Sequence, residues 1–310
     1  MRGNIRFILS FTVFVILAAL YIFKYDGNDY SMYMNYYYSE GFNFDLGYET
    51  LAVASKKLGL KFEYFYCIYN SFNLILFGML CKWRSDRMLI GLIPLMIFPG
   101  LPLNTIRQFT AGLICAIAYD RAYPENRKLY VILVLLACQF HISAALFLLP
   151  LAQERLRVLI LLLPIAIFAL AYFNSYANFL LVKISYYYDG GAKEAWYEQS
   201  IGKAIMFLVL SLLLFGGGYI WRLGEYLKYR PIIIFAVISM LASAQTSIFM
   251  RFLYLFLPAI SVWMYTCSRR VKLIFFFPLW ITGVINIYFV WAVWSGDAYI
   301  HRNYLLDFFK

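Results

Sequence analysis

Two arginines are unusual because apolar sequence flanks each of them. Arg107 lies in the stretch NTIRQF and Arg251 in the stretch IFMRFL. An arginine within a membrane span costs about 2.5–3.5 kcal/mol on insertion scales, so such a residue usually has a partner or a function. One guanidinium group can bind two oxygens of a phosphate at once, so two guanidinium groups suit a diphosphate. The alternative for each is a structural role, in which it reaches lipid headgroups or pairs with a loop carboxylate.

Three other residues are candidates for proton transfer. Asp29 and Asp45 lie in a polar segment after the first apolar run, and a carboxylate beside a substrate hydroxyl can act as a general base. Asp29, Tyr33 and Tyr37 share one helical face at positions i, i+4 and i+8. His141 is the one histidine inside an apolar run. Solvated loop charges for the aspartates and a packing role for the histidine remain open.

The composition describes a membrane protein. The chain has 310 residues, of which 64% are hydrophobic and only 14% are charged, against about 25% charged in a soluble domain. This excludes a cytosolic enzyme, a disordered protein and a small disulfide scaffold. The net charge of +11 comes from short basic clusters between apolar runs, so membrane topology explains it better than a nucleic-acid partner. We therefore predict an all-α polytopic membrane protein.

The apolar runs define the expected membrane segments. A crossing needs about 20 residues, and we expect about 10–11 segments in all, including a re-entrant hairpin. The runs are residues 7–23, 64–81, 88–106, 129–153, 158–182, 204–221, 231–250, 252–268 and 273–296, with a tenth, 108–119, that is long enough only if it includes Arg107 and its neighbours.

Orientation follows from lysine and arginine in the short connections, which favour the cytoplasm. All the basic clusters reach that side only if the run 129–153 enters and leaves the membrane on the same side. Its polar centre is CQFHIS, residues 138–143. We therefore predict a re-entrant helical hairpin with His141 at its apex, whereas a single straight span is the alternative. In this topology Arg107 and Arg251 both lie at the external ends of spans.

We expect a single integral membrane domain over residues 1–310, with external loops 24–63 and 183–203. Within the first loop, Tyr48, Leu51, Ala52, Ser55 and Leu58 follow helical spacing and predict a helix in the membrane interface. The N-terminal apolar run is expected to remain as an uncleaved span. No disulfide and no metal site of cysteine or histidine is expected.

Five short motifs, in this order, resemble the EpsG/Wzy group of bacterial polysaccharide polymerases. Leu46 stands where the family pattern has proline. The motifs are GxDxxxY at 27–33, FDLGYExL at 44–51, IRQ at 106–108, FHISAA at 140–145 and RxxY at 251–254.

The resemblance implies a GT-C-like membrane glycosyltransferase on the outer face of the bacterial cytoplasmic (inner) membrane. Its substrates would be undecaprenyl-diphosphate-linked oligosaccharides, joined into O-antigen, capsule or exopolysaccharide. The expected partners are these lipids, membrane lipids and a polysaccharide chain-length regulator. No cofactor and no metal ion is expected, because arginines would supply the positive charge.

The site residues expected on this basis fall into three groups. The diphosphate would be bound by Arg107 and Arg251, and the catalytic groups would be Asp29, Asp45 and His141. Tyr33, Tyr48 and Tyr254 are candidates for sugar contacts.

Three other functions remain open at this point. An O-antigen ligase would share the arginines and differ in its acceptor. A flippase or other transporter of the lipid-linked oligosaccharide would be expected to show inverted repeats and broken helices. An acyltransferase that modifies polysaccharide would need access to a cytoplasmic acyl donor.

Overall fold

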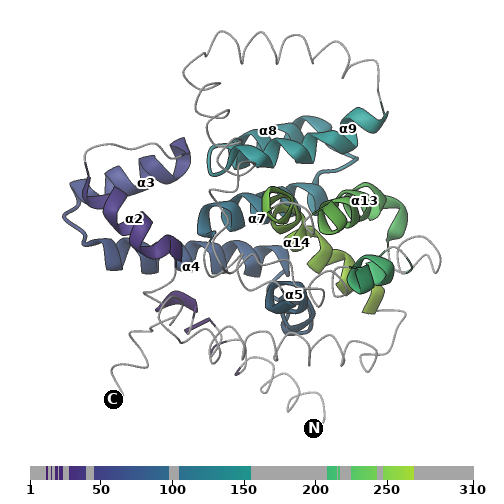
Figure 1. The fold of residues 1–310 in the computed structure, drawn as a ribbon, viewed down its shortest axis with the longest axis horizontal. Coiled ribbons are helices and arrows are strands. Elements are labelled where there is room, and N and C mark those ends of the chain that lie inside the picture. The colour runs from purple at the N-terminus through teal and green to yellow at the C-terminus, as the bar shows by residue number, and fades with distance from the viewer. Residues whose placement is uncertain are drawn as a thin grey trace. The chain divides into compact units, whose positions relative to one another are not determined.

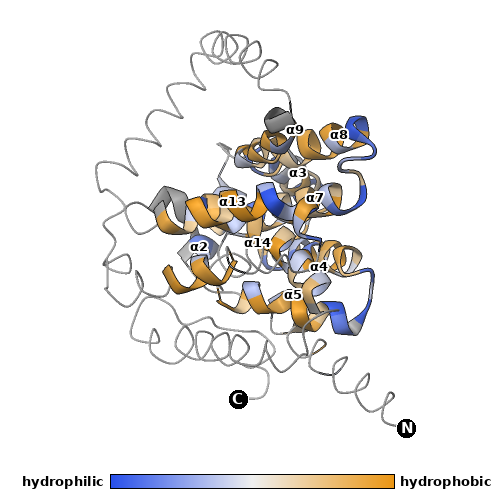
Figure 2. Cartoon of the chain, turned by 90° about the vertical axis from the view of Figure 1, so that its right-hand side faces the viewer, coloured by the Kyte–Doolittle hydropathy of each residue, from blue (hydrophilic) through white to orange (hydrophobic). Residues whose placement is uncertain are grey.

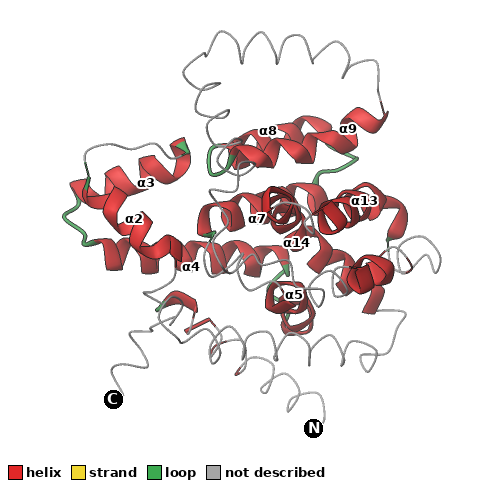
Figure 3. Cartoon of the chain, in the orientation of Figure 1, coloured by secondary structure: helices red, strands yellow, loops and turns green. Residues whose placement is uncertain are grey.

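The part of the chain that the structure describes is entirely helical. The computed structural model describes residues 28–39, 45–97, 105–154, 208–214, 225–242 and 247–268, together with residue 216 and a few positions between 12 and 23. Within these residues there are helices and no strand (Figure 1, Figure 3), so the predicted all-α class is confirmed there. The helices are α2 (Asn28–Tyr38), α3 (Leu46–Lys57), α4 (Phe62–Leu80), α5 (Ser85–Ile97), α7 (Ile106–Arg121), α8 (Arg127–Cys138), the 3₁₀ helix η1 (Ile142–Leu148), α9 (Leu149–Glu154), α13 (Tyr226–Ala242) and α14 (Ser247–Ser268).

The chain forms two compact units. The first comprises residues 1–144, 223–225 and 254–310, and the second comprises residues 145–222 and 226–253. Helices α2 to α8 and most of α14 therefore belong to the first unit, and α9 and α13 belong to the second. A single integral membrane domain stays a prediction.

Helix α7 is the centre of the first unit. It packs against α4 and α8, and Figures 1 and 2 both show it between them. Every residue from Ile106 to Tyr119 is buried, as is typical of a helix that is covered on all sides. At Gly112 the backbone of α14 comes so close that an added Cβ would lie 3.1 Å from the carbonyl oxygen of Leu255. The polar residues at the start of α7 are thus enclosed by protein.

A buried hydrogen-bond network fixes the first turns of α7 to α4. The Thr110 hydroxyl lies 2.8 Å from the Tyr69 hydroxyl, 2.6 Å from Oδ1 of Asn73 and 2.9 Å from the Ile106 carbonyl oxygen. Nδ2 of Asn73 donates to the Tyr21 hydroxyl at 3.2 Å and to the same carbonyl at 3.4 Å. Buried polar groups need such partners, so the network holds α4 and α7 in one register.

Aromatic rings fix α2 and α3 to α4. Tyr33 and Tyr37 of α2 are both 2% exposed, and Asp29 on the same face is half-buried, as the predicted spacing requires. The helix expected within residues 48–58 is confirmed as α3. Tyr48 and Ala52 are buried, whereas Leu51 and Leu58 are 40% and 77% exposed.

The contacts of Tyr48 account for its burial. Its ring packs against the rings of Tyr33, Phe65 and Tyr69, so α3 turns this one edge toward α2 and α4. The location of α3 in the membrane interface stays a prediction.

Several predicted segment limits are corrected. The run 88–106 is not one helix, because α5 ends at Ile97 and Ile106 already belongs to α7. Arg107 is therefore the second residue of α7, and this helix includes it, as the short run 108–119 required. Arg251 lies inside α14, which begins at Ser247. The runs 158–182 and 273–296, the loop 183–203 and most of 7–23 and 204–221 lie outside the described residues.

The polar centre of the run 129–153 interrupts the helix. Helix α8 ends at Cys138, a turn follows, and η1 begins at Ile142. The re-entrant course of this segment stays a prediction. Across the part of the chain that the structure describes, no helix is both long enough and sufficiently apolar to pass through a bilayer.

Two of the basic clusters that are predicted to be cytoplasmic lie together in the first unit, namely Lys82/Arg84/Arg87 and Arg121/Arg127/Lys128. Nζ of Lys82 is 3.6 Å from a carboxylate oxygen of Asp120, and Arg121 donates to the Met79 carbonyl oxygen at 2.6 Å. Figure 2 shows the hydrophilic α4–α5 and α7–α8 connections near each other. Arg107 and Arg121 lie at opposite ends of α7, about 21 Å apart at 1.5 Å per residue.

The network around Thr110 predicts a loss of stability in Thr110→Val. Valine keeps the shape but leaves its partners on α4 without the hydroxyl, which we expect to cost on the order of 1 kcal/mol. Thermal unfolding of the detergent-solubilised protein measures this. Ser71→Ala is the matched control, because the Ser71 hydroxyl bonds only to the Cys67 carbonyl of its own helix among the described contacts. Equal midpoints for the two variants would contradict the proposed role of the network.

Candidate functional site

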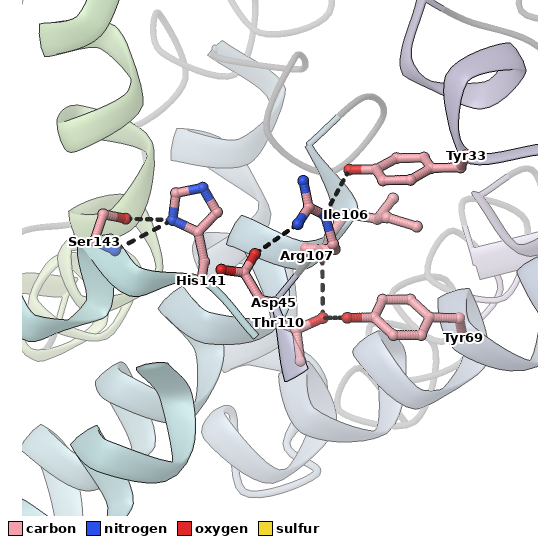
Figure 4. A network of polar contacts seen from close by, with 8 residues as sticks. All are labelled: Tyr33, Asp45, Tyr69, Ile106, Arg107, Thr110, His141 and Ser143. Carbon is pink, nitrogen blue, oxygen red and sulfur yellow. Dashed lines mark hydrogen bonds and ion pairs between the residues drawn. The ribbon is translucent and has the colours of Figure 1, made fainter. Parts of the chain in front are cut away.

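Arg107 is a buried cation at the start of α7. The residue is 9% exposed. Its Nε donates to the Tyr33 hydroxyl at 3.4 Å, and one terminal nitrogen lies 2.5 Å from Oδ2 of Asp45 (Figure 4). A charged group can be buried only if other groups compensate it, so the surroundings of Arg107 are built around its charge.

Asp45 supplies the opposite charge from a different motif. It is the N-cap residue of α3, with φ −66° and ψ 139°, and its side chain makes no capping hydrogen bond to that helix. Its carboxylate is instead in the ion pair with Arg107, where the Asp45 side chain is 17% exposed. Pairing with a loop carboxylate was the structural alternative for Arg107. The pair also joins two predicted site residues in one place.

Two tyrosine rings enclose the same guanidinium. The Arg107 Cζ atom lies 5.6 Å from the ring centre of Tyr33 and 5.8 Å from that of Tyr48. Such cation–π contacts contribute about 0.5–2 kcal/mol, most where water is excluded. Burial, followed by the nearby Tyr33, raises the pKa of Tyr48 well above its ordinary value, so the Tyr48 hydroxyl stays protonated at physiological pH.

A close backbone contact joins α3 to the turn that carries His141. The Gly47 N–H donates to the Gln139 carbonyl oxygen at 2.6 Å. A Cβ atom at Gly47 would lie 2.9 Å from that oxygen and 3.2 Å from its carbon, a separation that only glycine permits without displacement. Asp45 and His141 are therefore each two residues from this contact. We call the Gly47–Gln139 contact the backbone joint.

The surroundings of His141 define its neutral tautomer. Its Nδ1 lies 2.6 Å from the Ser143 hydroxyl and accepts from the Ser143 N–H at 3.4 Å (Figure 4). A backbone N–H can only donate, so Nδ1 is an acceptor and the neutral ring carries its proton on Nε2. His141 is half-buried, and its Nε2–H is a donor suited to an anionic oxygen.

Three further predicted site residues, Asp29, Arg251 and Tyr254, lie on other helices than α7 and α3. Asp29 is half-buried one turn before Tyr33 on α2. Arg251 belongs to the second unit and Tyr254 to the first, and both are half-buried on α14. The joint action of Arg107 and Arg251 stays a prediction.

Sequence reasoning did not identify the buried polar residues that bond to the first turn of α7. Asn73 and Thr110 are fully buried and hold the turn that carries Arg107. A signal was present, because Asn70 and Asn73 interrupt the apolar run 64–81, and polar residues in such runs usually have a specific partner. Gly47 belongs to the motif at 44–51, but no pattern in the sequence indicates its contact with Gln139.

Comparison with known proteins gives one family match. The family model described as the EpsG family matches residues 7–304, nearly the whole chain, which confirms the resemblance seen in the five motifs. No curated protein and no solved structure matches the chain.

The backbone joint predicts that Gly47→Ala displaces the start of α3. The added methyl group would contact the Gln139 backbone, and overpacking of this kind costs about 1–3 kcal/mol. We expect a lower thermal midpoint together with reduced function. Thr50→Ala serves as the control on the next turn, since the Thr50 hydroxyl is exposed and bonds to the Leu46 carbonyl. A Gly47→Ala protein as stable and active as wild type would show that the joint tolerates a side chain.

Proposed function

Because the chain belongs to the EpsG family, we propose that it is a membrane polymerase that joins undecaprenyl-diphosphate-linked oligosaccharide repeat units. The family suggests a role related to polysaccharide polymerisation. The observation that carries the finer proposal is the buried Arg107–Asp45 pair, which unites a cation and a carboxylate from two motifs. The product would be O-antigen, capsular polysaccharide or exopolysaccharide, with a chain-length regulator as a candidate partner.

We place the protein in the cytoplasmic membrane with the site facing outward. EpsG proteins are typically membrane proteins. Support for the orientation comes from α7, which has Arg107 at one end and Arg121 at the other. Arg121 belongs to the basic clusters, and basic connections favour the cytoplasm. The opposite end of α7 would then face the side on which a translocated lipid-linked sugar is presented.

Arg107 would bind the donor diphosphate. Its planar fork of donors matches phosphate oxygens, and it lies in the first turn of α7, where the helix dipole also favours an anion. As the bond from the sugar to the diphosphate breaks, negative charge grows on the leaving oxygen, and a fixed cation in a water-poor site stabilises it. Arg251 stays the candidate for a second cation, on the argument from its sequence motif.

Asp45 would be the general base. Its carboxylate would take the proton from the acceptor hydroxyl, whose oxygen then bonds to the anomeric carbon of the donor sugar. The bond from that carbon to the phosphate oxygen breaks, and undecaprenyl diphosphate leaves with the electron pair. Asp29 is the alternative base, one turn from Tyr33 on α2. The contact of Asp45 with Arg107 favours Asp45.

His141 would donate a hydrogen bond from Nε2 to the diphosphate. The Ser143 contacts hold Nδ1 as an acceptor, which keeps the donor on the opposite side of the ring. Tyr33 and Tyr48 are each 2% exposed and surround the guanidinium, so we assign them to holding Arg107. Sugar contacts for these tyrosines and for Tyr254 stay predictions.

Deletion of the gene in its native host tests the function. The surface polysaccharide should change on a gel from a ladder or long polymer to single repeat units, and wild type should restore it. Arg107→Ala should fail to restore it, because loss of one stabilising donor lowers such rates about 10²–10³-fold. Arg107→Lys should restore little, since lysine keeps the charge but loses the fork.

Arg127→Ala is the control for this test, because Arg127 is exposed at the other end of the α7–α8 pair. All variants must be present in membranes at wild-type levels. Unchanged polymer length in the deletion strain would rule out a polymerase. Intact polymer that is no longer attached to its final acceptor would indicate a ligase instead.

The hydrogen bond proposed from Nε2 of His141 can be tested with two variants. His141→Gln can place an amide donor near the position of Nε2, whereas His141→Ala supplies none. We expect polymerisation by membranes containing the alanine variant to fall about 10²-fold, with partial activity in the glutamine variant. Rates measured with a lipid-linked repeat unit would show this. Equal rates for the two variants would assign His141 a packing role.

A further inference from the structure

The Asp45 carboxylate is bound to the Arg107 guanidinium, which is the group that the proposed function assigns to the diphosphate. One terminal nitrogen of Arg107 is 2.5 Å from Oδ2 of Asp45. Both the carboxylate and a diphosphate oxygen would accept hydrogen bonds from the same planar fork. A diphosphate that approaches Arg107 therefore meets an anion of the protein already in contact with it.

The N-terminus of α3, the helix that Asp45 directly precedes, offers an alternative position for its carboxylate. Its backbone has the extended conformation of an N-cap residue, with φ −66° and ψ 139°, and it directly precedes α3. At this position an aspartate side chain commonly accepts a hydrogen bond from a backbone N–H of the first helical turn. Here the side chain makes no such bond and turns toward Arg107. Rotation of the side chain would carry the carboxylate from one position to the other.

We propose that the diphosphate of the donor displaces Asp45 from Arg107, and that the released carboxylate moves to the N-terminus of α3. This inference rests on the proposed function, which supplies the diphosphate. The displacement keeps Arg107 compensated throughout, by the carboxylate before binding and by the diphosphate after it. Such compensation matters because Arg107 is 9% exposed and a buried cation without a counter-charge is strongly destabilising.

The displacement also fixes the order of events. While Asp45 is in the ion pair, its carboxylate is bound to Arg107. This is the carboxylate that would take the proton from the acceptor hydroxyl. Donor binding releases it, so the base becomes competent only when a leaving group is in place. Tyr33 and Tyr48 would hold the guanidinium in position during the exchange, since Nε of Arg107 bonds to the Tyr33 hydroxyl and a terminal nitrogen forms the bond to Asp45.

Binding of inorganic diphosphate to the full-length protein in lipid nanodiscs tests this competition. Asp45→Asn removes the competing charge, so we expect its dissociation constant for inorganic diphosphate to fall about tenfold relative to wild type, within the usual range of coupling between sites. Polymerisation by the same variant should fall. Arg107→Gln should lose the binding, and inorganic sulfate serves as the control for nonspecific anion binding.

Glu49→Gln is the matched control. It removes one carboxylate from the first turn of the same helix, but Glu49 is not the partner of Arg107 in the ion pair. Its affinity for diphosphate should remain that of wild type. Asp45→Ser is a second variant without the charge, with a hydroxyl that can cap α3, and it should also bind diphosphate more tightly than wild type.

The outcomes separate the displacement from the polymerase function. If both Asp45 variants, folded by thermal unfolding, bind diphosphate no more tightly than wild type, the displacement is wrong, even if Arg107 is required for polymerisation. A comparable gain in Glu49→Gln would also overturn it, because the effect would be a general one of charge. Tighter binding of diphosphate by the Asp45 variants alone would support the displacement. If the wild-type protein forms no polymer in the same study, the polymerase function is rejected while the displacement stands.

Discussion

A positive charge that is largely withdrawn from water is the constraint on which the first unit depends. Arg107 is buried within the first turn of α7, and a buried cation is tolerated only where nearby groups compensate it. Asp45 meets this requirement from α3, while Tyr33 of α2 and Tyr48 of α3 cover the guanidinium. Four residues from three helices thus converge because one of them carries a charge.

The helix that carries this charge is itself held by polar contacts. Thr110 lies one turn after Ile106 and joins α7 to Tyr69 and Asn73 of α4. Apolar packing alone leaves rotation and sliding between two helices weakly specified, whereas directional hydrogen bonds in a dry interior specify one arrangement. The network therefore positions Arg107 without touching it. Tyr69 of α4 also packs its ring against Tyr48. One residue of α4 thus contacts both the Thr110 network and a ring that covers Arg107.

Much of the local structure followed from the sequence, and the contacts between distant residues did not. Apolar runs predicted the helices now seen as α4 and α7, and the polar centre around His141 predicted the interruption after α8. The chemistry of Arg107 and Asp45 was assigned to each separately, but their contact joins residues 62 positions apart, and no local pattern encodes that separation.

The limits of α5 and the choice of buried residues on α3 could not be predicted, for a related reason. A continuous apolar run from 88 to 106 does not show where one helix stops and another starts. Helical spacing on α3 marks Leu51 and Tyr48 as neighbours, yet only Tyr48 finds ring partners on α2 and α4. Burial depends on what lies opposite, which the spacing within one segment does not contain.

The backbone joint between Gly47 and Gln139 has unequal consequences for its two residues during evolution. The hydrogen bond uses the amide of one residue and the carbonyl of the other, so the chemical identity of the residue at 139 is not part of the bond. The absence of a side chain at 47 is part of it, because the backbone of 139 occupies that space. Related chains that retain this fold should thus vary freely at position 139 and keep glycine at position 47.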